Sequence, residues 1–143
     1  MADDHATEAL LALRGIRLAH LDVSLLVLNS ASDCIVDKST LIKQALAAMN
    51  RAGFAESEDD SGSSPTLVLQ IYYTQDRQNQ ICVADSSVRL EQWIDHKGTR
   101  VRAVYYESEG LVSGTTSSFT EKVETQMNGH LATFLALWKT MNQ

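Results

Sequence analysis

Residues 66–112 read TLVLQIYYTQDRQNQICVADSSVRLEQWIDHKGTRVRAVYYESEGLV and contain three runs with the composition of β-strands. The three runs are 66–74, 80–94 and 99–112. Short polar segments at 75–79 and 95–98 separate them, and polar turns between strand-forming runs favour hairpins. The stretch therefore predicts an antiparallel three-stranded meander.

The segment that precedes this meander carries the periodicity of a strand and a helix. Alternating apolar residues over 17–28 predict a strand whose last part is apolar on both sides. Apolar residues at helical spacing over 41–49 predict a helix. Asp37 or Ser39 would supply its N-cap, and Gly53 would end it.

A second helical segment closes the chain. Ser118 and Glu121 match the capping box, in which two side chains satisfy the first free amides of a helix. The apolar stripe that follows steps by three or four residues and comprises Phe119, Val123, Met127, Leu131, Phe134, Trp138 and Met141. This stripe predicts a long helix packed against the core.

Length and element order together predict the fold class. A chain of 143 residues fits a single domain, 1–143, and a short apolar helical stretch over 6–13 precedes the first strand. We predict an α+β fold, in which a short N-terminal helix is followed by β-α-β-β-β-α, with two helices on one face of a mainly antiparallel four-stranded sheet. Residues 1–15 then form an N-terminal helical arm, and the acidic, serine-rich residues 56–64 form a mobile loop.

The composition argues against several classes of partner. A hydrophobic share of 44% and a charged share of 21% are typical of a soluble globular protein. The formal net charge of -6 argues against nucleic acid, whose binding requires a basic surface. No apolar run reaches the roughly 18 residues of a membrane span. The N-terminus has no secretory signal, so we expect a cytoplasmic protein, or a periplasmic or secreted one if a signal has been removed.

Metal binding receives little support from the sequence. Cys34 and Cys82 lie far apart and match no zinc-site spacing, and the histidines show no short His–His spacing. We therefore expect neither a metal nor another cofactor. For the cysteines we expect buried free thiols, with a disulfide as the alternative that spacing alone does not decide.

The second hairpin sets which residues share a face of the sheet. A four-residue turn at 95–98 predicts that Leu90 and Val101 lie on the core face. The phase of the last helix aims its apolar stripe at the same face. We therefore expect both side chains to be buried against Phe134 or Trp138.

The opposite side of the sheet, which we call the outer face, is expected to be apolar for a surface in water. The register places these residues on it: Tyr72, Val83, Trp93, Val104 and Tyr106. It also predicts an ion pair between Glu91 and Arg102 and a cation–π contact between Trp93 and Arg100. The N-terminal helix covers part of this face, or a partner does, most simply a second copy of the chain. We predict a homodimer formed through it.

Residues suited to chemistry are scattered rather than gathered in a motif. The chain has no nucleophile elbow and no Walker loop. The main hypothesis is therefore a non-enzymatic binding or assembly domain. The alternative is a small-molecule site or an enzyme, with a pocket between sheet and helices, acting on anionic ligands through Asp85, Arg89, His96, Arg100 and Arg102.

The order of short motifs resembles an uncharacterised bacterial family of single α+β domains. Residues Leu13–Ile16 read LRGI, similar to the L-x-G-I entry of that family, and Asn50–Phe54 read NRAGF, similar to its A-G-F helix end. Phe134 ahead of Asn142 in the last helix is the third point of likeness. The resemblance covers residues 13–142. It implies an α+β fold that often follows a secretion signal, and it implies no activity or ligand.

Overall fold

The computed structural model describes residues 10–28, 33–58 and 64–143. The elements in chain order are β1 (Leu18–Val27), α2 (Lys38–Ala52), β2 (Ala55–Glu56), β3 (Thr66–Asp76), β4 (Ile81–His96), β5 (Thr99–Thr115) and α3 (Phe119–Met141). The α+β class and the two long helices are therefore confirmed. Residues 6–9, which are half of the helix expected over 6–13, and the middle of the loop expected over 56–64 lie outside the described residues.

The five strands form one mixed sheet in the order β2-β1-β3-β4-β5. β1 runs parallel to β2 and β3, whereas β3, β4 and β5 form the expected antiparallel meander. The expectation of a four-stranded, mainly antiparallel sheet is therefore wrong. Helix α2 carries the chain back between β1 and β3, so these two strands point the same way, as in other β-α-β units. The two residues of β2 follow α2 and add a fifth strand at the β1 edge.

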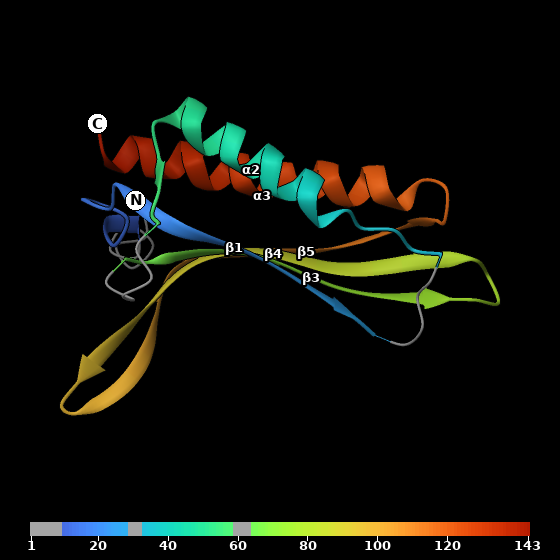
Figure 1. Cartoon of the computed structure of the whole chain (residues 1–143), viewed down its shortest axis with the longest axis horizontal. Helices are drawn as coiled ribbons and strands as arrows, with labels where there is room; N and C mark the ends of the chain where they lie inside the picture. The colour runs from blue at the N-terminus through green and yellow to red at the C-terminus, as the bar shows by residue number, and fades with distance from the viewer. Residues whose placement is uncertain (1–9, 29–32, 59–63) are drawn as a thin grey trace, which may run out of the picture.

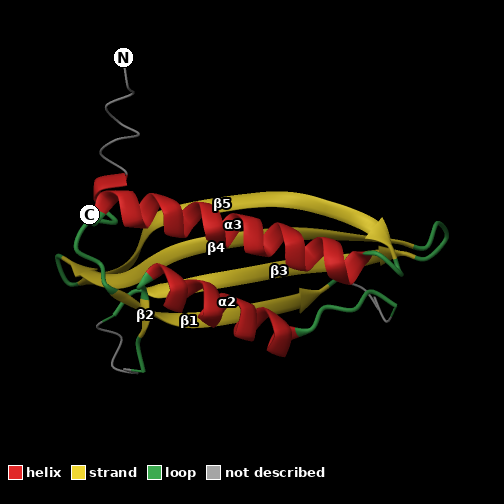
Figure 2. Ribbon diagram, turned by 90° about the horizontal axis from the view of Figure 1, so that it is seen from above, coloured by secondary structure: helices red, strands yellow, loops and turns green. Residues whose placement is uncertain are grey.

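Helices α2 and α3 both pack on one face of this sheet (Figure 1, Figure 2), and the core lies between the two layers. The core includes these strand residues of the helix face: Leu67, Leu69, Ile71, Val88 and Leu90. Phe134 and Trp138 of α3 both make edge-on ring contacts with Phe54, at 5.8 and 4.8 Å between centroids. The expected burial of Leu90 is thus confirmed.

Helix α2 begins and ends where its sequence indicates. The Asp37 carboxylate accepts hydrogen bonds from the backbone amides of Ser39 and Thr40, at 3.1 and 3.4 Å, and from both hydroxyls. The hydroxyl of Thr40, and after it that of Ser39, lowers the pKa of Asp37 because these bonds favour the charged carboxylate. Gly53 ends the helix in the left-handed conformation, at φ 79°, and Phe54 then enters the core.

Helix α3 begins without the expected capping box. Ser118 already has a helical backbone, and its hydroxyl contacts Thr115 rather than the first amides of the helix. The expectation is wrong because a tight turn at 116–118 leads from β5 directly into the helix. A tertiary contact secures this end instead, since the Thr120 hydroxyl donates to the carbonyl of Ile35 at 2.7 Å.

The described part of the N-terminal arm, 10–15, and the residue that follows it are attached to the C-terminal end of α3. Leu13 is fully buried in the core. The indole Nε1 of Trp138 donates to the carbonyl of Ile16 at 2.6 Å, and Nδ2 of Asn142 donates to the carbonyl of Leu13 at 3.0 Å. These contacts hold residues 10–16 to α3 and the core.

Cys34 and Cys82 form a disulfide, with their Cα atoms 5.8 Å apart. The expectation of free thiols is therefore wrong. Cys82 lies on the helix face of β4, and Cys34 lies in the segment that enters α2. The sequence separation of 48 concealed this pair, because the contact depends on how β4 and the segment that enters α2 come together in the folded chain.

The turn of the second hairpin is shorter than expected. Lys97 and Gly98 both have positive φ, 51° and 82°, as in the two-residue type I′ turns that suit twisted strands. His96 consequently pairs with Thr99, whereas the expected four-residue turn at 95–98 would pair Ile94 with Thr99.

A β-bulge in β5 then changes which residues face the helices. Leu90 pairs with Tyr106 but Glu91 pairs with Val104, so Tyr105 is an extra residue. Both tyrosines pack against the core, and the Tyr106 ring lies 5.1 Å from a phenylalanine ring of α3. The expected position of Tyr106 on the outer face is wrong for this reason.

Beyond the bulge, residues 91–104 form what we call the projecting hairpin, which leaves the helix layer and curls toward the outer face (Figure 1). Val101 belongs to this hairpin and is 36% exposed. The expectation that Val101 is buried is wrong, because the hairpin extends past the helices that would cover it.

Candidate functional site

The outer face, on the side of the sheet away from the helices, is the candidate site. Side chains alternate along a strand, so the even-numbered residues of β1 and β3 and the odd-numbered residues of β4 form it. In β5, even-numbered residues up to Val104 and odd-numbered residues from Glu107 lie on it, because of the bulge. Along the strands it consists of three parts: the projecting hairpin, a polar centre and an apolar hollow.

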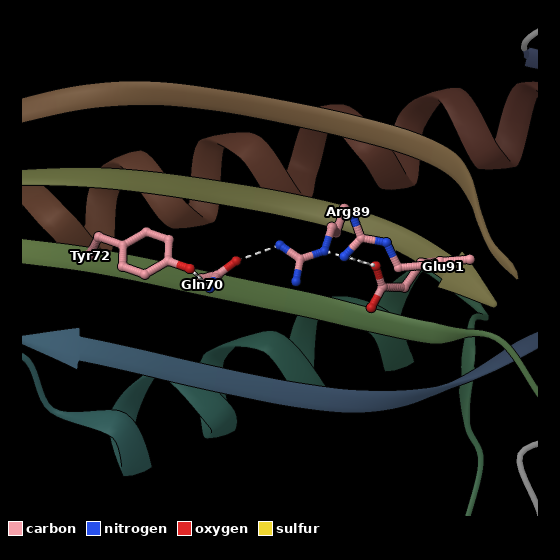
Figure 3. Close-up of polar contacts among 5 residues, drawn as sticks. Gln70, Tyr72, Arg89 and Glu91 are labelled. Atoms are coloured by element: carbon pink, nitrogen blue, oxygen red, sulfur yellow. Dashed lines mark hydrogen bonds and ion pairs between the residues drawn. The ribbon is translucent and has the colours of Figure 1, made fainter. Parts of the chain in front are cut away.

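The polar centre is a chain of contacts across three strands (Figure 3). Gln70 donates from Nε2 to the Tyr72 hydroxyl, and its Oε1 accepts from Nη1 of Arg89. Nε of Arg89 donates to Oε2 of Glu91 at 2.9 Å, and Nη1 of Arg102 lies 3.5 Å from the same oxygen. The predicted ion pair between Glu91 and Arg102 is confirmed.

These contacts form a layer over the middle of the sheet. Val68 lies on the outer face and is nevertheless buried. The side chains of Arg89 and Glu91 are only 17% and 12% exposed. Two arginines share the single carboxylate of Glu91, so the polar centre is satisfied internally and retains one positive charge in excess.

The projecting hairpin presents an aromatic side chain and cations on the outer face. Trp93 is 51% exposed, and the Arg100 guanidinium lies 5.2 Å from the centre of its ring, which confirms the predicted cation–π contact. Val104 is exposed on the same face. His96 forms the last pair before the turn and is also exposed.

An apolar hollow of about 340 Å³ occupies the opposite end of the outer face. Its walls come from the residue that follows β1 and from β3, β4 and β5, and they comprise Leu28, Tyr72, Tyr73, Thr74, Val83, Asp85 and Leu111. Leu111 is 75% exposed, the largest exposure among the described large apolar side chains. Sequence reasoning did not single out Leu111, because unbroken alternation from Val104 would place it on the helix face, and only the bulge turns it to the outer face.

The charges of the outer face are unevenly distributed. The projecting hairpin carries three cations, Lys97, Arg100 and Arg102, against two carboxylates, Glu91 and Asp95. Asp85 lines the hollow, Glu109 lies two residues before Leu111 on the same face, and Glu107 pairs with Arg89 between the two ends. Within the described part of the chain, Asp85, Glu107 and Glu109 make no ion pair. The hairpin end of the face therefore has a small excess of positive charge, and the hollow end has carboxylates without an ion-pair partner.

The structure brings the predicted site residues into two separate groups. Trp93, Arg100, Arg102 and Val104 lie together on the projecting hairpin, and Arg89 lies between them and the hollow. Tyr72, Val83 and Asp85 lie together in the hollow. His96 belongs to neither group, and Tyr106 is on the helix face.

Hollows on the helix side lie at its margins. One of about 530 Å³ adjoins the C-terminal end of α2 and β2, and two of about 290 and 390 Å³ lie between α2 and α3 on their solvent side. The alternative hypothesis had placed a pocket between sheet and helices. Among the residues that the structure describes, no three His, Cys, Asp or Glu side chains gather as a metal-binding group.

One half-buried serine–histidine pair joins β5 to α3. Oγ of Ser108 in β5 is 3.1 Å from Nδ1 of His130 in α3. Nε2 of His130 is buried and has no hydrogen-bond partner among the described atoms. The hollows described above are lined by other residues.

Fold and site together define an α+β protein with one sheet face covered by helices and the other exposed. No described helix is long and apolar enough to cross a membrane. No protein-family model matches the chain, and no curated protein matches it significantly.

Two solved structures align with most of the chain at low similarity. The crystal structure of an uncharacterized protein covers 84% of this chain and 90% of its own, with 14% sequence identity and a TM-score of 0.43. That of a minor lipoprotein from Acinetobacter baumannii covers 87% of this chain and 89% of its own, with 12% identity and a TM-score of 0.35. Similarity at this level supports no conclusion about function.

Proposed function

We propose that this protein is a non-enzymatic binding or assembly domain that forms a homodimer through its outer face. The observation that carries the proposal is the exposure of large apolar side chains on this face: Leu26, Leu28, Tyr72, Trp93, Val104 and Leu111. Apolar surface gathered on one face is typical of interaction sites, because its exposure to water is unfavourable.

The residue types of this face support a protein partner. Trp93, Tyr72 and Arg100 are of the kinds that contribute most to binding at the centres of interfaces. They stand on strands, so little conformational freedom is lost on association. A two-fold axis uses one such surface twice and requires no second protein, which favours a homodimer.

A second candidate function is the binding of a small anion on the projecting hairpin. The observation in its favour is the excess positive charge where Arg89 and Arg102 share Glu91, beside the stacked Arg100. Titration with inorganic phosphate, followed by calorimetry, tests it. Saturable binding that Arg100→Ala abolishes would support this candidate, and absence of heat would eliminate phosphate as its ligand.

We also propose that the protein acts in an oxidising compartment, as a periplasmic or secreted protein. The disulfide between Cys34 and Cys82 supports this, because such bonds are rare where thiols are kept reduced. Thiol titration of protein isolated from its native host under denaturing, non-reducing conditions is expected to find no free cysteine. Two free thiols per chain would contradict the proposal.

Sedimentation with a matched pair of variants tests the homodimer. Val104 and Val101 lie in the same strand, with exposures of 42% and 36%, but on opposite faces of the projecting hairpin. Val104→Glu is expected to shift the protein from dimer to monomer, whereas Val101→Glu is expected to leave the dimer intact. A wild-type protein that is monomeric at every accessible concentration would refute the proposal.

A further inference from the structure

We infer that the two copies lie antiparallel across their outer faces, so that the projecting hairpin of each enters the apolar hollow of the other. The inference rests on the homodimer proposed above and adds which parts of the two copies meet. The occupant of the hollow is therefore a second copy of this chain.

The strand register makes the two ends of the outer face complementary under a two-fold rotation. Trp93 lies four residues after Arg89 in β4, and Asp85 lies four residues before it. A two-fold axis in the plane of the interface, crossing the strands at Arg89, brings Trp93 of one copy opposite Asp85 of the other. The same rotation brings Arg102, the pair partner of Trp93, opposite Leu111, the pair partner of Asp85.

The parts that meet in this arrangement fit chemically. Trp93 is a large, half-exposed ring, and it arrives at a hollow of about 340 Å³ whose walls include Tyr72, Val83 and Leu111. A ring placed there would bury apolar surface of both copies, and the indole N–H would lie near the Asp85 carboxylate that borders the hollow. Each copy supplies one ring and one hollow, so both contacts form at once.

The uneven charges favour the same arrangement over its alternative. Antiparallel copies bring Arg100 and Arg102 of one hairpin to the hollow end of the other face, where Glu109 lies beside Leu111 and makes no ion pair with a described residue. Copies joined hairpin to hairpin would instead bring together the excess positive charge of both hairpins, and like charges across an interface oppose association. Complementary charge therefore favours the antiparallel arrangement.

The course of the chain agrees with this arrangement. The projecting hairpin curls toward the outer face rather than continuing in the plane of the sheet (Figure 1). The bulge at Tyr105 lies where the hairpin leaves the helix layer, and bulges of this kind bend a strand and increase its twist. A hairpin curled in this direction reaches over the surface of a molecule lying against the outer face.

Reversal of single charges, followed by mixing, tests the inference. Arg102→Glu and Glu109→Arg are each expected to raise the homodimer dissociation constant at least about 10-fold, because each places like charges in contact twice. An equimolar mixture of the two variants is expected to restore dimers to within about 3-fold of wild type, since both contacts then join opposite charges. Lys139→Glu, which reverses a charge at an exposed position of α3, is the control and is expected to leave the homodimer dissociation constant unchanged.

A second pair of variants decides the matter if Arg102→Glu does not fold. Trp93→Ala removes the ring, and Leu111→Glu alters the hollow at a side chain that is mostly exposed. Each variant alone is expected to be monomeric, and their mixture is expected to form a heterodimer through the one intact ring and hollow. Failure of both mixtures to form heterodimers, with wild type still dimeric, would overturn the inference and leave the proposed function standing. A monomeric wild type would overturn both.

Discussion

The two faces of this sheet are made from the same strands but differ in their environment. On the helix face, Leu69, Ile71 and Leu90 are buried against α2 and α3. On the outer face, Tyr72, Val104 and Leu111 remain exposed, and the buried Val68 is covered by polar side chains of the sheet itself. Successive residues of one strand therefore contribute to two different tasks. The helix face supplies stability, and the outer face is the surface through which we propose that the protein associates.

The difference in exposure between the two faces of the sheet ends at the bulge in β5. Before it, one face of the β4–β5 pair is covered by α3; beyond it, apolar residues are exposed on both sides of the projecting hairpin, as Ile94 and Val104 show. The projecting hairpin contributes few side chains to the core of its own molecule. Its residues can therefore serve contact with another molecule.

Leu90→Ala is expected to lower the free energy of unfolding by about 2–5 kcal/mol, because it leaves a cavity at a fully buried site. Val104→Ala, on the outer face, is expected to change it by less than about 0.5 kcal/mol in the monomer. Urea unfolding of both variants measures the difference. Equal losses would abolish the distinction between the two faces.

Replacement of both Cys34 and Cys82 by serine is expected to cost about 2–4 kcal/mol, since the bond closes a long loop in the unfolded chain. The bond ties the helix face of β4 to the segment that enters α2. Thermal unfolding with and without reductant measures the effect. Reductant is expected to destabilise wild type to the level of the double variant, and a double variant as stable as oxidised wild type would contradict the expectation.

Gln70→Ala is expected to cost about 1–2 kcal/mol, because it removes the link between Tyr72 and Arg89 and leaves a half-buried guanidinium donor unsatisfied. Gln78→Ala, in an exposed turn, is the matched control and is expected to have little effect. Chemical unfolding compares the two. If both variants are neutral, the polar centre contributes nothing to the stability of the outer face.

Deletion of residues 58–63 is expected to change the free energy of unfolding by less than about 1 kcal/mol. The hydroxyl of Ser57 donates to that of Ser64 at 3.1 Å, so the two ends of the loop already lie side by side. Thermal unfolding and sedimentation measure stability and association. A large loss of stability or of association would show that the acidic loop contributes to the helix face or to the outer face.

The smallest effect is expected at Asp37, whose lowered pKa makes its contribution depend on pH. The stabilisation is fully present above the ordinary pKa of 3.8 and is lost as the pH falls through the lower value of the folded state. The melting temperatures of wild type and Asp37→Ala are therefore expected to differ at pH 7 and to converge in acid. Asp37→Asn keeps a capping oxygen without a charge and is expected to show a weaker dependence. Association through the outer face is expected to be unaffected by either change.

Much of the local structure could be predicted from the sequence, because its determinants lie close together in the chain. Alternation in 66–74 predicted a strand with one core face, and the stripe of α3 predicted a helix packed on that face. Asp37 and Gly53 marked the ends of α2. The contacts of Glu91 with Arg102 and of Trp93 with Arg100 were predictable because each joins residues near one hairpin turn.

The tertiary structure decided what depends on residues that are distant in sequence or on a single extra residue. The parallel pairing of β1 with β3, and the disulfide between Cys34 and Cys82, follow from the path of the chain through α2. Tyr106 faces the core because of the bulge in β5. Packing of the Tyr106 ring against α3 offsets the small local free-energy cost of the bulge. The periodicity of apolar residues indicates which side of a strand is apolar, because residues close together in the sequence determine that side. Which surface then covers that side is decided by packing between elements that only the folded chain brings together.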